Sequence, residues 1–174
     1  MQGEASRYDE WYDTPLGAFV FARELETILD LADLKPGQLV LEVGCGGCVL
    51  LERLKALGCQ VVGVDPSPFA AEAGRRKDIN VIQEIFPPSS LNCRPDLIFQ
   101  VDVLEHIEDP LSLLRAEAEC LDEGGLIVVN VPDCSRSIEL GDISMALHQH
   151  VNMFDHISLP ATLRAAGLDG LGWK

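Results

Sequence analysis

The chain has 174 residues, enough for one domain with a substantial core, and its 47% hydrophobic and 24% charged residues are ordinary for a globular protein. Its formal charge of −15 argues against a nucleic-acid binder, because such a protein neutralises phosphates with clustered Lys and Arg. No apolar run approaches the roughly 20 residues of a membrane span, and the N-terminus lacks the apolar core of a secretory signal, so we expect a cytoplasmic protein without a membrane partner.

A first helix is predicted where apolar side chains recur at helical spacing between residues 16 and 34, before Lys35-Pro36-Gly37 ends the pattern. Beyond it, short apolar runs alternate with helical segments. The predicted strands are residues 38–43, 60–64, 79–82, 96–100 and 126–131. The further predicted helices are residues 48–57, a helix capped by Ser67 with Pro68 in its first turn, residues 110–121 and residues 158–166.

Strands that alternate with helices, each strand a near-continuous apolar run, are typical of a parallel sheet covered on both faces. We therefore predict an α/β fold of the doubly wound, Rossmann-like kind, with a mostly parallel sheet and helices on both faces. In such a fold the ligand crevice lies at the carboxyl ends of the strands. Binding residues are expected at that edge.

A glycine-rich loop, residues 42–48, joins the first predicted strand to the next helix. Its glycines allow a tight turn and a close approach of a ligand, and the helix behind it offers free N–H groups. Asp65 ends the second strand 21 residues after Gly44, where a carboxylate can accept both hydroxyls of a ribose. Together the loop and the acid predict a nucleoside-binding site.

Two features of this loop favour a cationic nucleoside over a dinucleotide. A dinucleotide fingerprint has glycine at its sixth position, where this chain has Val49. Glu42 precedes the first glycine by two residues, where its charge would repel a pyrophosphate but suits a sulfonium that carries an amino acid. Two alternatives stay open: an NAD(P)-binding oxidoreductase, although no Tyr-x-x-x-Lys pair follows, and a non-catalytic domain that binds the sulfonium or a partner.

Five segments carry a family resemblance: residues 41–46, 64–67, 95–99, 103–110 and 121–126. In this order they resemble the class I S-adenosylmethionine-dependent methyltransferases, especially the small-molecule branch. The resemblance implies an enzyme that uses S-adenosylmethionine as cofactor and methylates a small molecule. It also implies a single domain over residues 1–174, with residues 1–35 as an N-terminal helical segment and residues 36–174 as the cofactor-binding core.

The resemblance further implies a set of cofactor-binding residues: Glu42, Gly44, Cys45, Gly46, Asp65, Pro66, Glu84 and Gln100. Gly44 and Gly46 would face the methionine portion, with Gln100 beside it, and Asp65 would face the ribose. Glu84 would contact the adenine amino group, for which Gln83 is nearly as good. Tyr12 is a further candidate to close over the cofactor.

Two histidines are candidates for the general base that an acceptor needs if it must lose a proton. His106 follows the fourth strand, although it could equally bond to backbone at the start of a helix. His150 follows the fifth strand, in a segment that forms part of the acceptor pocket in the family. Asp102, Glu105 and His106 also resemble an acid-x-x-Glu-His pattern that binds a divalent ion in some quinone-pathway O-methyltransferases, but a solvated acidic helix start is favoured and no metal is expected.

Several features depart from the family pattern. Cys48 stands where the family has a third glycine, and its spacing from Cys45 is that of half a zinc or redox site, which we interpret as free thiols. The chain stops at Trp173-Lys174, so the C-terminal strand pair is expected to be incomplete. Either the chain is truncated or a partner covers the sheet edge, and a homodimer is one such arrangement. The single basic cluster, residues 75–77, is interpreted as a solvated helix end.

Overall fold

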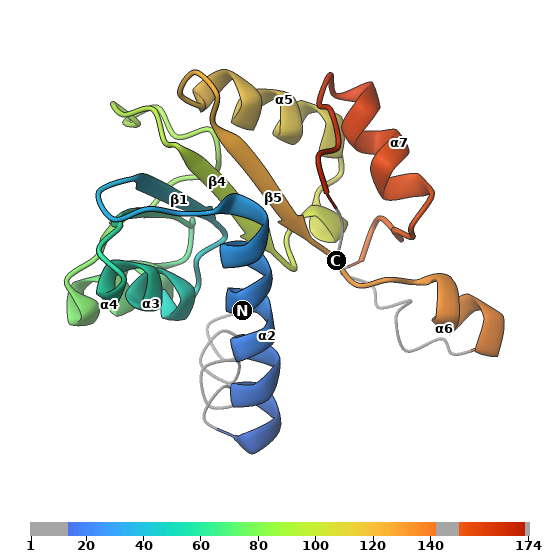
Figure 1. The fold of residues 1–174 in the computed structure, drawn as a ribbon, viewed down its shortest axis with the longest axis horizontal. Coiled ribbons are helices and arrows are strands. Elements are labelled where there is room, and N and C mark those ends of the chain that lie inside the picture. The colour runs from blue at the N-terminus through green and yellow to red at the C-terminus, as the bar shows by residue number, and fades with distance from the viewer. Residues whose placement is uncertain (1–13, 142–149, 173–174) are drawn as a thin grey trace.

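The computed structural model describes residues 14–141 and 150–172, and five parallel strands form its sheet, in the order β3-β2-β1-β4-β5 (Figure 1). The strands are β1 (Leu39–Val43), β2 (Gln60–Val64), β3 (Asn80–Ile82), β4 (Leu97–Val101) and β5 (Leu126–Asn130). Each lies within two residues of its predicted bounds. The strand order reverses between β1 and β4, so the ligand crevice of this fold lies at their carboxyl ends.

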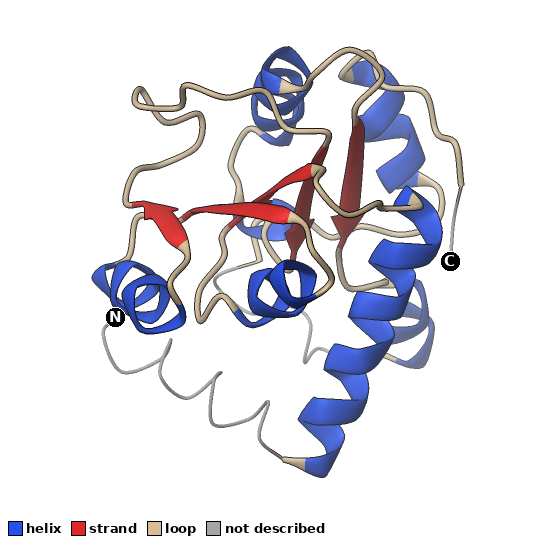
Figure 2. Ribbon diagram, turned by 60° about the vertical axis from the view of Figure 1, so that its left-hand side comes forward, coloured by secondary structure: helices blue, strands red, loops and turns tan. Residues whose placement is uncertain are grey.

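Helices cover both faces of the sheet (Figure 2), which confirms the predicted doubly wound fold class. One face carries α2 (Pro15–Ala32), α3 (Val49–Ala56) and α4 (Pro68–Lys77). The other carries α5 (Pro110–Cys120) and α7 (Ser158–Ala165). The sequence did not predict the short 3-10 helix η1 (Leu104–His106) or α6 (Ser135–Leu140).

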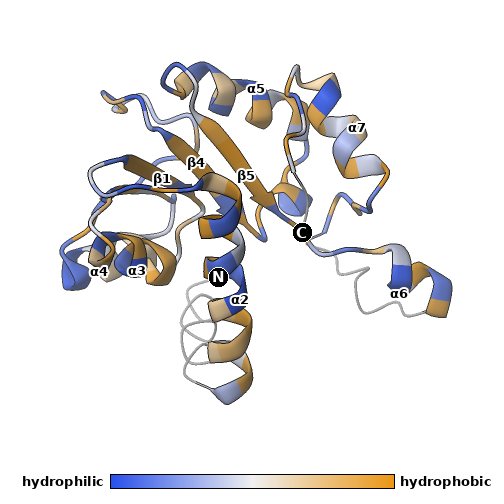
Figure 3. Cartoon of the chain, in the orientation of Figure 1, coloured by the Kyte–Doolittle hydropathy of each residue, from blue (hydrophilic) through white to orange (hydrophobic). Residues whose placement is uncertain are grey.

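Strand residues divide between two apolar clusters, one on each face, because successive side chains of a strand point to opposite sides. Val40 packs with Ile28 of α2 in one cluster, whereas Leu41 and Val43 pack with Leu114 of α5 in the other. Figure 3 shows β4 and β5 as hydrophobic ribbons, as expected for strands covered on both sides. By the same alternation, the side chain of Glu42 in β1 points to the face that α2, α3 and α4 cover.

Local signals fix the helix ends as predicted. The Ser67 hydroxyl accepts a hydrogen bond from the Ala70 N–H at 3.1 Å, with Pro68 at the start of α4. Residues 75–77 form the last turn of that helix, where cations oppose the negative end of the dipole, which confirms their interpretation as a helix end. Gly58, at φ 92°, ends α3 in a conformation that favours glycine.

One edge of the sheet is formed by β5. Within the described ranges β5 pairs with β4 alone, and residues 168–172 form no strand beside it. Within residues 14–141 and 150–172, no helix is both long and apolar enough to cross a membrane.

Candidate functional site

The loop between β1 and α3 is built around two glycines with positive φ, Gly44 at 73° and Gly46 at 43°. A Cβ on Gly44 would lie 2.5 Å from Cγ2 of Val103, so any other residue there would collide with the segment that follows β4. A Cβ on Gly46 would meet nothing within 4 Å. The loop is therefore packed against the protein at its first glycine and open at its second, as a loop that admits a ligand requires.

Asp65 lies directly beside this loop, as the predicted nucleoside site requires. Its Oδ2 accepts a hydrogen bond from the Gly46 N–H at 3.0 Å, and its Oδ1 accepts one from the Ser67 N–H at 2.8 Å. A carboxylate offers about four lone-pair positions, so both oxygens keep acceptor capacity for ribose hydroxyls. Asp65 thus braces the loop and can still bind a sugar.

Glu42 lies beneath the loop as a buried carboxyl, with 6% of its surface exposed. No hydrogen-bond partner for its Oε2 occurs in the described part of the chain. Burial, and next the charges of Cys48, Asp65 and Glu24, raise its pKa well above the usual value. A cationic ligand would stabilise the charged form of this buried carboxyl, whose Oε2 lacks a described partner. The residues present therefore fit S-adenosylmethionine, which is a cation.

The two candidates for the adenine contact differ in placement. The Glu84 carboxylate accepts hydrogen bonds from the Ser89 N–H at 2.8 Å and the Ser90 hydroxyl at 2.6 Å, and these serines lower its pKa. It is therefore engaged within its own loop. The Gln83 amide instead donates to the Pro66 carbonyl at 3.5 Å, which brings Gln83 beside the turn that follows Asp65. The structure thus favours Gln83 over Glu84 for this contact.

The side chain of Gln100 is directed away from the glycine loop. Its Nε2 donates to both carboxyl oxygens of Glu117 in α5, at 2.9 and 3.1 Å, and both residues are fully buried. Burial raises the pKa of Glu117 to about 8. This pair lies between β4 and α5, so the Gln100 side chain is engaged with Glu117, and the place of Gln100 beside the methionine portion stays a prediction.

The thiol of Cys45 is buried beneath the glycine loop. A Cβ on Gly63 of β2 would lie 2.5 Å from the Cys45 Sγ, so the thiol fills the space beside that glycine. A hydrogen bond with Cys48, followed by burial, raises the pKa of Cys45, and the two sulfurs are 3.9 Å apart. No disulfide joins any of the six cysteines, all of which lie within the described residues. The thiol of Cys45 is a packing group beneath the loop.

Glu105, His106 and His150 form a histidine–glutamate cluster. One ligand-type atom from each lies within 4.8 Å of the others. Glu105 Oε1 is 3.7 Å from His106 Nε2, and the two imidazole rings meet edge to face with centroids 4.8 Å apart. Burial raises the pKa of Glu105, whose two carboxyl oxygens have no hydrogen-bond partner among residues 14–141 and 150–172. The cluster can exchange a proton or hold a divalent cation.

Main-chain contacts place this cluster at the carboxyl edge of the sheet. The Asn152 N–H donates to the Glu105 carbonyl at 3.0 Å, and its amide Nδ2 donates to the Ile107 carbonyl at 2.6 Å. These bonds join the segment after β5 to η1, which follows β4. Because Val103 contacts Gly44 in the same segment, the cluster is next to the glycine loop. His106 and His150 are therefore brought together, whereas Tyr12 lies outside the described residues.

The sequence missed one acidic residue at this edge, Glu24 of α2. Burial, and next the charge of Asp102, raise its pKa to about 7, and its Oε2 is buried without a hydrogen-bond partner in the part of the chain described. The one signal in the sequence was a carboxylate on a helix face that also carries Phe21, Leu25 and Ile28.

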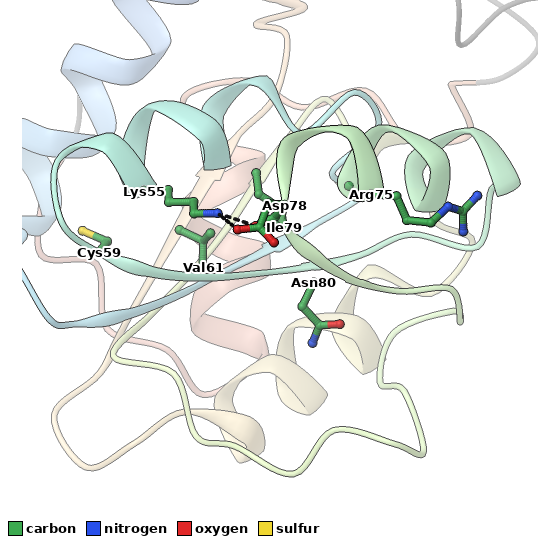
Figure 4. Close-up of a pocket in the computed structure, with 8 residues that line it drawn as sticks. Lys55, Cys59, Val61, Arg75, Asp78, Ile79 and Asn80 are labelled. Carbon is green, nitrogen blue, oxygen red and sulfur yellow. Dashed lines mark hydrogen bonds and ion pairs between the residues drawn. The ribbon is translucent and has the colours of Figure 1, made fainter.

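Two hollows are present in the described part of the molecule. Figure 4 shows the first, where Lys55 of α3 bonds to the Asp78 carboxylate at 2.9 Å, beside Asn80 at the start of β3. Since β3 begins there, this hollow is at the amino edge of the sheet and away from the crevice. The second follows β5 between α2 and residues 167–172 and includes Glu24.

Comparisons with known proteins agree with this geometry. A family profile described as a methyltransferase domain matches residues 16–171. The ubiquinone biosynthesis O-methyltransferase of Cereibacter sphaeroides (strain ATCC 17029 / ATH 2.4.9) is 32% identical over 126 residues, which cover 67% of this chain and 49% of that protein. The chain therefore spans about half the length of the curated relatives that it matches.

Solved structures share the fold. A Thermotoga maritima S-adenosylmethionine-dependent methyltransferase has a TM-score of 0.72 at 21% identity, covering 96% of this chain and 78% of that one. The N-methyltransferase NodS of Bradyrhizobium japonicum, solved with S-adenosylhomocysteine, has a TM-score of 0.61 at 22% identity, covering 76% and 70%. The family match over residues 16–171, on this sheet order and this glycine loop, shows that the chain belongs to the class I S-adenosylmethionine-dependent methyltransferases.

Proposed function

We propose that the protein is an enzyme that transfers the methyl group of S-adenosylmethionine to a hydroxyl oxygen of a small molecule. The observation that carries the proposal is the orphaned carboxyl of Glu42 beneath an open glycine loop that Asp65 braces. The curated relative is named an O-methyltransferase, which supports oxygen as the acceptor atom.

The binding roles follow from the positions of the side chains. The Asp65 carboxylate binds the ribose hydroxyls, and the main chain of the glycine loop lies along the methionine portion. Glu42 supplies negative charge beneath that portion. The cofactor supplies a methyl group already activated on a sulfonium, so positioning the acceptor about 3 Å from that methyl provides most of the rate.

The histidine–glutamate cluster removes the proton that the acceptor must lose. An imidazole nitrogen of His106 or His150 would accept the hydroxyl proton, and S-adenosylmethionine would supply the methyl group that the oxygen receives. Glu105, with Oε1 3.7 Å from His106 Nε2, stabilises the resulting imidazolium. The same compact set of ligand-type atoms would also suit a divalent cation, which would lower the pKa of the hydroxyl, but the role that we propose for the cluster is that of a base without a metal.

Calorimetry and turnover test the proposal together. The wild type binds S-adenosylhomocysteine more tightly than NAD and methylates members of a panel of phenols and sugars from labelled S-adenosylmethionine. Asp65→Ala weakens S-adenosylhomocysteine binding about 100-fold, since two charge-assisted hydrogen bonds are lost, whereas Asp122→Ala, at an exposed turn, leaves it unchanged. Tighter binding of NAD would identify an oxidoreductase instead. Binding without turnover on any acceptor would identify a non-catalytic domain.

A homodimer and a cytoplasmic location remain predictions. The outer edge of β5 has unpaired backbone groups in the described part of the sheet, and such an edge can accept a strand from a second copy. Light scattering after size exclusion would give a mass of twice 19.0 kDa for a dimer. A mass of 19.0 kDa would contradict it.

A further inference from the structure

Glu24 differs from its charged neighbours on α2. Arg23 and Glu26 form an exposed ion pair at 2.7 Å, with side chains 64% and 60% exposed. Glu24, between them, has a buried Oε2 that bonds to no group in the described ranges. This oxygen of the partly buried Glu24 therefore faces the protein, where a carboxylate without a donor is unfavourable.

A second carboxyl, that of Glu42, is near enough to Glu24 for their charges to interact. Val40 and Glu42 of β1 point to the same face of the sheet, and Val40 packs there with Ile28 of α2. The charge of Glu24 is one of those that raise the pKa of Glu42. Only 6% of the surface of Glu42 is exposed, and its Oε2 also lacks a hydrogen-bond partner in the described chain. Two orphaned carboxyl oxygens whose charges interact are thus buried on the face of the sheet that α2 covers.

The nearby cation does not satisfy this pair. Lys77 lowers the pKa of Glu42, but its Nζ is 3.0 Å from Oε2 of Glu52. Asp102, at the end of β4, adds a third negative charge near Glu24. A ligand that satisfies these oxygens must bring both positive charge and N–H donors.

The cofactor has one such group. Its sulfonium is positive but has no N–H, whereas its α-ammonium has three donors and a full charge. We propose that the Glu24 carboxylate, with Glu42 beside it, binds the α-ammonium group of the cofactor's methionine portion. This inference rests on the proposed function, and it makes α2 part of the cofactor site.

The test compares two ligands that differ only in this group. One is S-adenosylhomocysteine, and the other is its desamino analogue, in which hydrogen replaces the ammonium. Calorimetry measures both ligands with the wild type, with Glu24→Gln, and with Glu26→Gln as an exposed control on the same helix. Circular dichroism confirms folding of each variant, and Glu24→Asp, which retracts the carboxyl by one methylene, replaces Glu24→Gln if the latter unfolds.

We expect Glu24→Gln to weaken S-adenosylhomocysteine binding about tenfold, the loss of roughly one charge-assisted hydrogen bond. Its affinity for the desamino analogue stays within twofold of the wild type, and Glu26→Gln matches the wild type for both ligands. An unchanged ratio of the two affinities in Glu24→Gln, or an equal loss for both ligands, overturns the inference while the proposed function stands. A wild type that does not bind S-adenosylhomocysteine overturns both.

Discussion

Replacing Glu117 by Gln should stabilise the protein, and the gain should grow with pH. Glu117 is fully buried in α5, where burial raises its pKa from 4.5 to about 8. Its one described hydrogen-bond partner, the Gln100 Nε2, donates to its oxygens, and the Gln100 Oε1 has no described partner. A glutamine at 117 accepts the same bond and can donate to that oxygen. It removes the ionisable group without emptying the space.

The magnitude follows from the pKa shift. Because the folded-state pKa lies above the unfolded one, the unfolded chain loses this proton at lower pH, and deprotonation favours unfolding. The unfolding free energy that Glu117 contributes has its full value below pH 4.5. Above that pH it decreases by about 1.4 kcal/mol per pH unit until pH 8. Relative to its value below pH 4.5, the unfolding free energy of the wild type is thus lower by about 3 kcal/mol at pH 7 and by about 5 kcal/mol above pH 8. The Glu117→Gln variant does not show this decrease, because it lacks the ionisable group.

Urea unfolding at pH 5, 7 and 8.5 measures this difference. Glu119→Gln is the matched control, because Glu119 is exposed on the same helix. We expect Glu117→Gln and the wild type to differ least at pH 5 and most at pH 8.5, while the control follows the wild type at every pH. A difference that does not change with pH, or a wild type that is the more stable protein at pH 8.5, would refute the assignment of a neutral acid paired with Gln100.

Three further predictions concern the site. Gly44→Ala lowers the unfolding free energy by about 2 kcal/mol, because its Cβ would lie 2.5 Å from Val103 Cγ2. The control Gly124→Ala has open space around its Cβ and only a positive φ, so it lowers the unfolding free energy by about 1 kcal/mol. Equal melting temperatures for the two variants would contradict the clash at Gly44. His150→Gln reduces kcat about 10²- to 10⁴-fold and leaves the affinity for S-adenosylhomocysteine unchanged. The control His156→Gln, at an exposed histidine, changes neither kcat nor this affinity. Equal losses of kcat in the two variants would exclude a base at residue 150. Dialysis against EDTA leaves the methyl-transfer rate unchanged, and a rate that disappears and returns with Mg²⁺ would assign the cluster to a metal.

The parts of the fold that the sequence predicted depend on local signals. Strand bounds followed from short apolar runs, and the start of α4 followed from Ser67 and Pro68, because a cap and its helix are adjacent in the chain. The pairing of the glycine loop with Asp65 was also predictable, since the carboxyl ends of neighbouring parallel strands meet at one edge. The short α6 and η1 were missed because neither is long enough to show a helical period.

What the sequence by itself determined is the order of strands and helices and the residues at the carboxyl edge, because these follow from periodicity and spacing along the chain. Only the tertiary structure decided which side chains meet there. It turned Gln100 towards Glu117, placed His150 beside Glu105 and brought the charge of Glu24 near enough to Glu42 to raise its pKa. Each of these contacts joins residues far apart in the chain, so it depends on how helices pack against the sheet, which no local pattern encodes.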